Sequence, residues 1–286
     1  MAFEELRVAP DSKFRLGDID SGYTGKFESK KQAEERLREG TERLRELQEK
    51  LYAQDRWAVL LIFQAMDAAG KDGTVEHVMS GVNPQGCQVY SFKAPSSEEL
   101  DHDFLWRTNR CLPERGRIGV FNRSYYEEVL IVRVHPQILR AQKLPPELVT
   151  KDIWKERYAD ICALERYLSR NATVIRKFFL HVGKEEQKKR FLARLDQPEK
   201  HWKFSLQDAK EREHWDAYME AYQDMLRATS TEQAPWYVIP ADHKWFTRMA
   251  VADIIVETLE ELKLEFPSLG KEKRAELAEA RKLLGS

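Results

Sequence analysis

An apolar run joined to a loop of small residues limits what this chain can fold into more than any other feature. The run AVLLIF occupies residues 58–63, and the loop QAMDAAGKDGT follows it over residues 64–74. A short run of branched apolar residues predicts a strand that is covered on both faces. A strand, a loop with glycine and lysine, and a following helix together are typical of a phosphate-binding loop.

The loop departs from the usual phosphate-binding pattern, G-x-x-x-x-G-K-[ST], at two positions. Ala65 stands in place of the first glycine, and Asp72 stands in place of the hydroxyl residue after Lys71. Asp67 adds a carboxylate, which would repel phosphate unless a cation lies between them. Because Mg²⁺ is commonly held by one or two carboxylates together with phosphate oxygens and water, we expect Asp67 to bind Mg²⁺, with Mn²⁺ as an alternative.

The remaining loop residues suit an anion. Backbone amides near Gly70 and Gly73 would point at a phosphate, and the start of the following helix adds its dipole. Lys71 would supply a positive charge, and Thr74 is a weaker candidate for holding the metal. The alternative is a surface turn that Asp67 caps, with Lys71 in solvent.

Strands and helices alternate along the rest of the chain. Four more strands are predicted by the apolar runs at 87–92, 117–121, 173–182 and 235–240. Helices are predicted over 29–54, 152–170 and 208–230. The first helix carries a narrow leucine stripe, which favours packing against the domain over a coiled coil, and the last carries a face that we expect to be buried. This alternation predicts an α/β fold with a parallel sheet, whose ligands bind at the carboxyl ends of the strands.

Composition excludes several classes of function. The net charge of the 286 residues is −1, so no general attraction to nucleic acid or membrane is expected. No apolar run reaches about 18 residues, and the N-terminus lacks the apolar core of a signal peptide. The cysteines at 87, 111 and 162 form no metal-binding pair and no disulfide framework. We therefore expect a cytoplasmic protein that binds neither nucleic acid nor membrane.

A second candidate group follows the strand predicted at 117–121. Asn122 and Arg123 come directly after this strand, and an arginine at a strand end suits bidentate binding of phosphate. Asn122 offers a neutral oxygen ligand. The structural alternative is an ion pair of Arg123 with Glu127 or Glu128.

A basic stretch follows the strand predicted at 173–182. Arg190 and Arg194 lie four residues apart and share one face of a predicted helix, and Lys203 follows farther on. Such a row of cations could close over a polyanion that is longer than one nucleotide triphosphate. A solvated helix face is the alternative, which the interspersed glutamates favour.

Five blocks of sequence together resemble the second family of polyphosphate kinases. In chain order they are QAMDAAGKDGT, FKAPSSEELDHDFLWR, GRIGVFNRSYYEEVLIVRVHP, KKRFLARLDQPEKHWKFS and RATSTEQAPWYVIPADHKWFTR, within about residues 25–265. The extension VLIVRVHP and Asn122 resemble the subgroup that phosphorylates both AMP and ADP. The resemblance implies a three-layer, thymidylate-kinase-like P-loop kinase fold with a parallel sheet and a helical lid.

The resemblance also implies an activity and a set of site residues. The terminal phosphoryl group of inorganic polyphosphate would be transferred to AMP and ADP, giving ADP and ATP, reversibly and with Mg²⁺. Asp67, Lys71 and Arg123 would act in catalysis, and Asp67 would bind the metal. The substrates would be bound by Ala68, Ala69, Gly70, Asp72, Gly73, Thr74, Lys93, Arg117, Asn122, Glu127, Arg190, Arg194 and Lys203. The family often has Asp where this chain has Asn122. This departure argues against a second metal held at this position and bears on the choice of acceptor.

The sequence divides into three expected parts, which are an irregular extension over 1–26, a kinase domain over 27–270 with a lid at about 184–230, and a helical tail over 271–286. A homo-oligomer is expected. Two other functions stay open, an ATP-dependent nucleoside-monophosphate kinase of the same fold and a non-catalytic polyanion-binding module. Asp67 argues against the module, because an anion binder gains nothing from a carboxylate in its loop.

Overall fold

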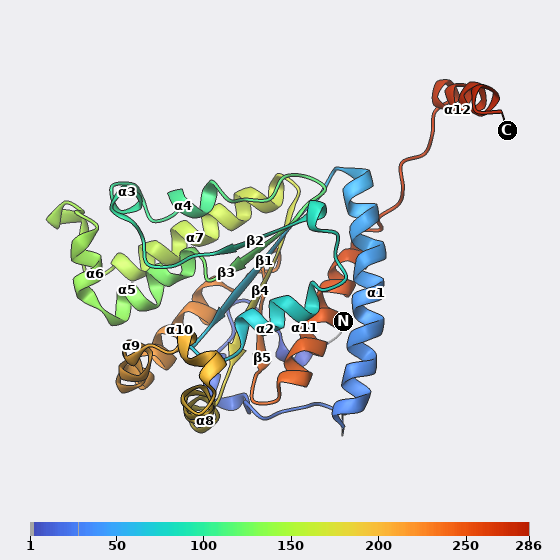
Figure 1. The fold of residues 1–286 in the computed structure, drawn as a ribbon. Helices are drawn as coiled ribbons and strands as arrows, with labels where there is room; N and C mark the ends of the chain where they lie inside the picture. The colour runs from blue at the N-terminus through green and yellow to red at the C-terminus, as the bar shows by residue number, and fades with distance from the viewer. Residues whose placement is uncertain (1–2, 28, 286) are drawn as a thin grey trace.

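A parallel five-stranded sheet organises the protein, whose computed structural model describes residues 3–27 and 29–285 (Figure 1). The strand order is β2-β3-β1-β4-β5. The strands are β1 (Ala58–Ala65), β2 (Cys87–Ser91), β3 (Ile118–Asn122), β4 (Thr173–His181) and β5 (Trp236–Pro240). The five predicted strands are confirmed, with ends that differ by one or two residues.

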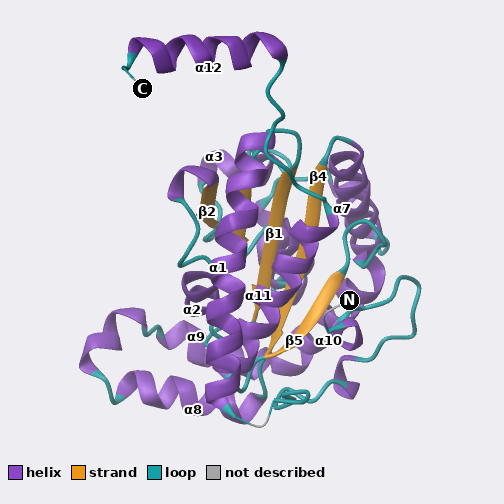
Figure 2. Cartoon of the chain, turned by 90° about the vertical axis from the view of Figure 1, so that its right-hand side faces the viewer, coloured by secondary structure: helices purple, strands orange, loops and turns teal. Residues whose placement is uncertain are grey.

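Helices cover both faces of this sheet and make three layers (Figures 1 and 2). One face carries α1 (Lys30–Gln54), α2 (Lys71–Val78) and α11 (Lys244–Glu261). The other face carries α7 (Ile153–Arg170) and α10 (Trp215–Thr229). Because helices cover both sides, β1 and β3 are buried along their whole length, as parallel strands in such folds are.

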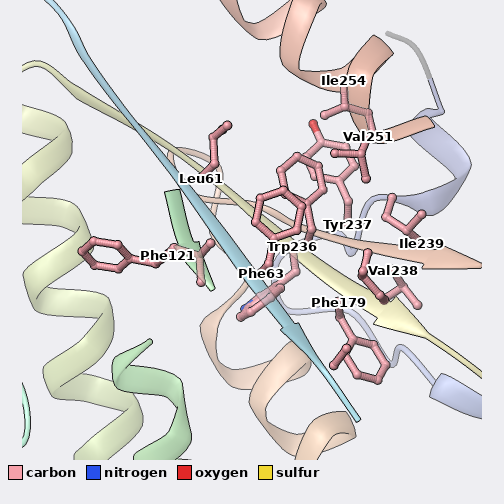
Figure 3. Close-up of a cluster of buried hydrophobic side chains, with 14 of the residues drawn as sticks. Leu61, Phe63, Phe121, Phe179, Trp236, Tyr237, Val238, Ile239, Val251 and Ile254 are labelled. Carbon is pink, nitrogen blue, oxygen red and sulfur yellow. The ribbon is translucent and has the colours of Figure 1, made fainter. Parts of the chain in front are cut away.

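The core lies between the sheet and these helices. Figure 3 shows Phe63 of β1, Phe121 of β3 and Trp236 of β5 in this core, and all three side chains are fully buried. The leucine stripe of α1 packs against α11, with Leu44 and Leu51 completely buried, so the prediction of packing against the domain is confirmed. Burying a leucine of this kind contributes about 1.5–3 kcal/mol.

The N-terminal segment lies along the outer edge of the sheet. The backbone amide of Val8 donates to the carbonyl of Trp236 at 2.9 Å, and Arg7 forms an antiparallel bridge with Tyr237. Two short 3₁₀ helices, η1 (Glu4–Leu6) and η2 (Leu16–Asp18), are the regular elements of this otherwise irregular segment. The side chains of Leu6, Val8 and Leu16 are buried, so the segment covers one end of the core.

The helix predicted over 208–230 is interrupted. The structure has α9 (Leu206–Lys210), the 3₁₀ helix η7 (Glu211–His214) and then α10. Glu211 contacts His135 at 2.7 Å and the Tyr218 hydroxyl at 3.0 Å. The helical periodicity of the sequence does not indicate these side-chain contacts. The apolar face of α10 is buried as predicted.

Shorter elements connect these parts. They are η3 (Pro84–Gly86), α3 (Ser97–Leu100), α4 (Trp106–Asn109), η4 (Tyr125–Val129), α5 (Ile131–Val134), α6 (Pro136–Ala141), η5 (Pro146–Leu148), α8 (Lys184–Leu195) and η6 (Pro198–Lys203). The last element is α12 (Lys271–Leu283). Helix α12 stands apart from the rest and buries none of its residues (Figure 1). Across the described residues, no helix combines the length and apolar character needed to cross a bilayer.

Candidate active site

The loop between β1 and α2 forms the base of the site. Its backbone turns through left-handed conformations at Ala68 (φ 63°) and Gly70 (φ 106°). Lys71 is the first residue of α2, and its Nζ donates to the carbonyl of Ala65 at 2.8 Å. Burial lowers the pKa of Lys71, and the charge of Arg123 acts in the same direction. An anion bound in this loop would therefore favour the charged form of this lysine.

Arg123 joins the loop to the neighbouring strand. Asn122 at the end of β3 pairs in register with Phe63 of β1, which brings the next residue beside the loop. The Arg123 guanidinium donates to Oδ1 of Asp67 at 2.8 Å and lies 4.0 Å from Oε2 of Glu127. Burial opposes the charged form, but the carboxylates of Glu127 and Asp67 outweigh it and raise the pKa of Arg123.

Asn122 and Thr74 hold the loop in place from two sides. The Nδ2 of Asn122 donates to Oδ1 of Asp72 at 2.6 Å, so the side chain that follows Lys71 is tied to β3. The Thr74 hydroxyl is buried and donates to the carbonyl of Gly70 at 3.0 Å. The single proton of the Thr74 hydroxyl is therefore used in a hydrogen bond at the start of its own helix.

A polar cavity of about 520 Å³ lies over the loop. It is lined by the whole loop from Met66 to Thr74 and by cationic side chains from four other parts of the chain. These cations are Lys93, Arg123, Arg194, Lys244 and Arg248. A cavity lined by this loop and by five cations suits a ligand with several negative charges.

A second cavity of about 400 Å³ adjoins the first one and is mostly apolar. Phe104, Ile131 and Val132 contribute to its walls, whereas Lys93 and Arg123 line both cavities. The two cavities thus meet at Lys93, Ala94 and Arg123. An apolar cavity of this size with a few polar groups is typical of a site for a small organic molecule.

The sequence matches one protein family over most of its length. Residues 27–267 match the family described as Polyphosphate kinase 2 (PPK2). This chain belongs to the polyphosphate kinase 2 family. The resemblance that the five sequence blocks indicate is therefore confirmed.

Named relatives and a solved structure of the polyphosphate kinase 2 family agree with this assignment. The ADP-polyphosphate phosphotransferase of Rhodopseudomonas palustris is 56% identical over 282 residues, which are 98% of this chain and 98% of that protein. The AMP/ADP-polyphosphate phosphotransferase of Meiothermus ruber is 47% identical and is aligned over 92% of this chain and 95% of that protein. A crystal structure of polyphosphate kinase 2 from Arthrobacter aurescens TC1 matches with a TM-score of 0.89 and 43% identity, over 98% of this chain and 96% of that chain. The predicted P-loop kinase fold is confirmed.

Most of the site residues that the sequence predicts meet in this one place. Besides Asp67, Lys71 and Arg123, the polar cavity is lined by Ala68, Ala69, Gly70, Asp72, Gly73, Thr74, Lys93, Asn122 and Arg194. Glu127 lines the adjoining apolar cavity and accepts from the amide of Gln64 at 2.8 Å. The side chain of Lys203 lies outside the described residues. The part that each of these residues plays with substrate stays a prediction.

The structure places two other predicted residues away from the cavity lining. Arg117 precedes β3, at the amino end of the strand, where its guanidinium lies 5.0 Å from the ring centre of Tyr52. The loop lies at the carboxyl ends of the strands, so Arg117 and the loop are at opposite ends of β3, and the predicted contact of Arg117 with substrate stays a prediction. Arg190 is buried beneath the loop and contacts its carbonyl oxygens, so it lies behind the loop rather than over the cavity.

Two cations of the cavity were not predicted from the sequence. Lys244 and Arg248 lie four residues apart at the start of α11, directly after the carboxyl end of β5. The rule that ligands bind at the carboxyl ends of parallel strands could have indicated them. Burial lowers the pKa of Arg248, as expected for a cation in a partly closed site.

Proposed function

We propose that this member of the polyphosphate kinase 2 family transfers the terminal phosphoryl group of inorganic polyphosphate to AMP and ADP, giving ADP and ATP. The observation that carries the proposal is the meeting of two different cavities at Arg123. The polar cavity over the loop suits a chain of phosphates, and the apolar one suits a nucleoside. A nucleotide in the apolar cavity would present its terminal phosphate to Arg123, next to the donor.

The reaction needs positioning and neutralisation of charge more than acid–base chemistry. An oxygen of the AMP or ADP phosphate forms a bond to the terminal phosphorus of polyphosphate, while the bond from that phosphorus to the bridging oxygen breaks. The shortened polyphosphate leaves as an oxyanion. No proton has to be removed from the acceptor, because its phosphate is already ionised at neutral pH.

Two cations are placed to offset the charge that spreads in this step. Lys71 lies at the base of the loop and would contact the donor phosphates. Arg123 lines both cavities and would contact the acceptor phosphate and the transferred group together. The ion pair between Arg123 and Asp67 fixes the direction of the guanidinium, since the two groups are 2.8 Å apart. The same groups serve the reverse reaction, because one phosphoanhydride replaces another.

The residues at the loop also fit Mg²⁺, with Mn²⁺ as an alternative. Asp67 and Asp72 are the carboxylates that line the polar cavity; Asp72 is held by Asn122, whereas the Asp67 side chain is 31% exposed. In residues 3–27 and 29–285, no three His, Cys, Asp or Glu side chains gather as a metal site. The ion would therefore be held by Asp67, substrate phosphates and water, as Mg²⁺ commonly is. When bound, the ion would supply positive charge that offsets the negative charge of the phosphates.

The acceptor range is the finer part of the proposal. One relative at 56% identity is named for ADP alone, and another at 47% identity is named for AMP and ADP. Asn122 is a neutral side chain that donates to Asp72, so the end of β3 adds no carboxylate of its own to the site. We propose that both AMP and ADP are accepted.

Further features of the proposal follow the same family relationship. We propose a cytoplasmic protein that acts as a homo-oligomer and binds neither nucleic acid nor membrane. The domain limits expected from the sequence, a kinase domain over 27–270 with a lid at about 184–230, remain part of this proposal.

The experiment that tests the function uses purified protein, AMP, Mg²⁺ and long-chain polyphosphate. The nucleotides are separated by chromatography, and we expect ADP first and then ATP. A parallel reaction contains ATP in place of polyphosphate. Turnover with ATP but not with polyphosphate would identify an ATP-dependent nucleoside-monophosphate kinase, and tight binding of polyphosphate without any turnover would identify a binding module.

A further inference from the structure

Helix α8 holds the phosphate loop through the carbonyl oxygens of three consecutive residues. Gln187 donates from Nε2 to the carbonyl of Asp67 at 2.9 Å. Arg190 donates from one terminal nitrogen to the carbonyls of Ala68 at 3.2 Å and Ala69 at 2.8 Å. Gln187 is only 1% exposed and Arg190 is 8% exposed, so both contacts are shielded from water.

Arg190 uses its remaining donors to fasten the loop to the rest of the site. Its second terminal nitrogen donates to the carbonyls of Ala241 at 2.6 Å and Asp242 at 3.0 Å, in the segment after β5. Its Nε donates to Glu186 at 2.9 Å on the same helix. Every nitrogen of this guanidinium therefore contacts the protein itself. A planar fork with five donors can do this, whereas a lysine cannot.

These contacts determine where the loop amides point. In a trans peptide the carbonyl and the following N–H point in opposite directions. Because the carbonyls of Asp67 and Ala69 are held by α8, the amides of Ala68 and Gly70 point away from α8. Ala68 and Gly70 both line the polar cavity. Ala68 also has a left-handed backbone, which costs an alanine about 1–2 kcal/mol and persists only where neighbouring groups hold it.

The same glutamine is linked to the segment between α9 and α10. Arg212 of η7 donates to Oε1 of Gln187 at 2.5 Å and to the carbonyl of Lys184 at 3.0 Å. Gln187 thus accepts a hydrogen bond from η7 and donates one to the loop. A single buried amide connects the segment after α9 with the backbone of Asp67.

We infer that Gln187 and Arg190 are positioning residues that direct the loop amides at the donor phosphates, and that Arg212 acts on the loop through Gln187. The inference rests on the proposed function for its substrate, a chain of phosphates. It gives Arg190 a role behind the loop in place of the direct substrate contact expected from sequence. It also explains how a loop without the usual first glycine keeps an anion-binding conformation.

The test is a double-mutant cycle read out by binding of tripolyphosphate, measured by isothermal titration calorimetry on the full chain. The variants are Arg212→Ala, Gln187→Met and the two together. We expect each single change to weaken binding about tenfold, the effect of one lost hydrogen bond to a charged or buried group. In the Gln187→Met background, Arg212→Ala should not weaken binding further, because the hydrogen bonds that link Arg212 to the loop through Gln187 are already absent.

Two further variants keep the outcome clear. Lys189→Ala, on the exposed side of α8, should leave binding unchanged, since its side chain is 82% exposed. Arg190→Lys keeps the charge but loses the fork, so it should weaken binding as Gln187→Met does and leave the KM for AMP unchanged. Additive losses of binding free energy in the double-mutant cycle would overturn the inference that Arg212 acts through Gln187. Tripolyphosphate binding at wild-type strength in Arg190→Lys and Gln187→Met would overturn the positioning role. Binding does not require turnover, so a wild-type protein that binds tripolyphosphate but transfers no phosphate refutes the proposed function alone.

Discussion

Replacing Lys177 by methionine should destabilise the whole fold, because this lysine is the cation of a buried network beside the site. Its Nζ donates to Oε2 of Glu165 at 2.6 Å, to the Tyr126 hydroxyl at 2.8 Å and to the carbonyl of Thr229 at 2.7 Å. Glu165 also accepts from the hydroxyls of Tyr125 at 2.9 Å and Tyr126 at 2.7 Å. Both tyrosines belong to η4, which begins two residues after Arg123.

The burial of the pair sets the size of the effect. The side chain of Lys177 is 0% exposed and that of Glu165 is 1% exposed. Removing one partner leaves the other charge buried without compensation, which costs about 3–5 kcal/mol. Burial lowers the pKa of Lys177, and the charge of Glu165 opposes this shift. Lys177→Met nearly conserves volume, so the loss should come from the charge rather than from a cavity.

The assay is urea unfolding at pH 7, followed by circular dichroism. We expect the free energy of unfolding to fall by about 3–5 kcal/mol in Lys177→Met. The matched control is Lys177→Met with Glu165→Gln, which removes both charges and should recover at least about half of the loss. A loss below about 1 kcal/mol in the single variant, or a double variant that is less stable than the single one, would refute this reasoning.

Three further predictions concern the site and the pH dependence of the fold. Lys71→Met should lower kcat by ~10³-fold in the chromatographic assay, because the loop cation offsets charge in the transition state; a variant that keeps more than about a tenth of the wild-type rate would argue against that role. Burial lowers the pKa of His181 below its ordinary value of 6.5, so the unfolded chain binds the proton more tightly and the free energy of unfolding should decrease as the pH falls below that value. Urea unfolding between pH 7 and pH 5 should show this decrease in the wild type and a smaller one in His181→Phe, whereas equal slopes would contradict the assignment. Ala141→Trp should fill part of the apolar cavity and raise the KM for AMP about tenfold without changing the KM for polyphosphate. An unchanged KM for AMP would indicate that the nucleoside binds outside this cavity.

The sequence was sufficient for the sheet and for the base of the site. The five strands are short runs rich in apolar residues, so their composition indicates them, including β2, which is partly exposed at the edge of the sheet. The loop residues are contiguous, and Asn122 and Arg123 directly follow a recognisable strand. Parallel pairing then brings both groups together at one edge of the sheet.

The sequence was not sufficient where a side chain acts through distant backbone. Arg190 and Arg194 share one face of a predicted helix, yet Arg194 lines the cavity and Arg190 lies buried behind the loop. Arg117 is next to a strand that leads to the site, but it lies at the opposite end of that strand. Gln187 has no charge and no motif, and only its contact with the Asp67 carbonyl shows its place. Helical spacing predicts which side chains share a face but not which atoms that face meets.

The charge of Asp67 is the feature of the proposed mechanism that a single measurement tests most directly. The initial rate with AMP and polyphosphate is measured against Mg²⁺ concentration for the wild type, for Asp67→Asn and for the exposed control Asp18→Asn. We predict that Asp67→Asn lowers the maximal rate by ~10³-fold and requires more Mg²⁺ for half-saturation, whereas Asp18→Asn matches the wild type. An Asp67→Asn protein with the wild-type rate and the wild-type dependence on Mg²⁺ would contradict a metal-binding role for this carboxylate among phosphates.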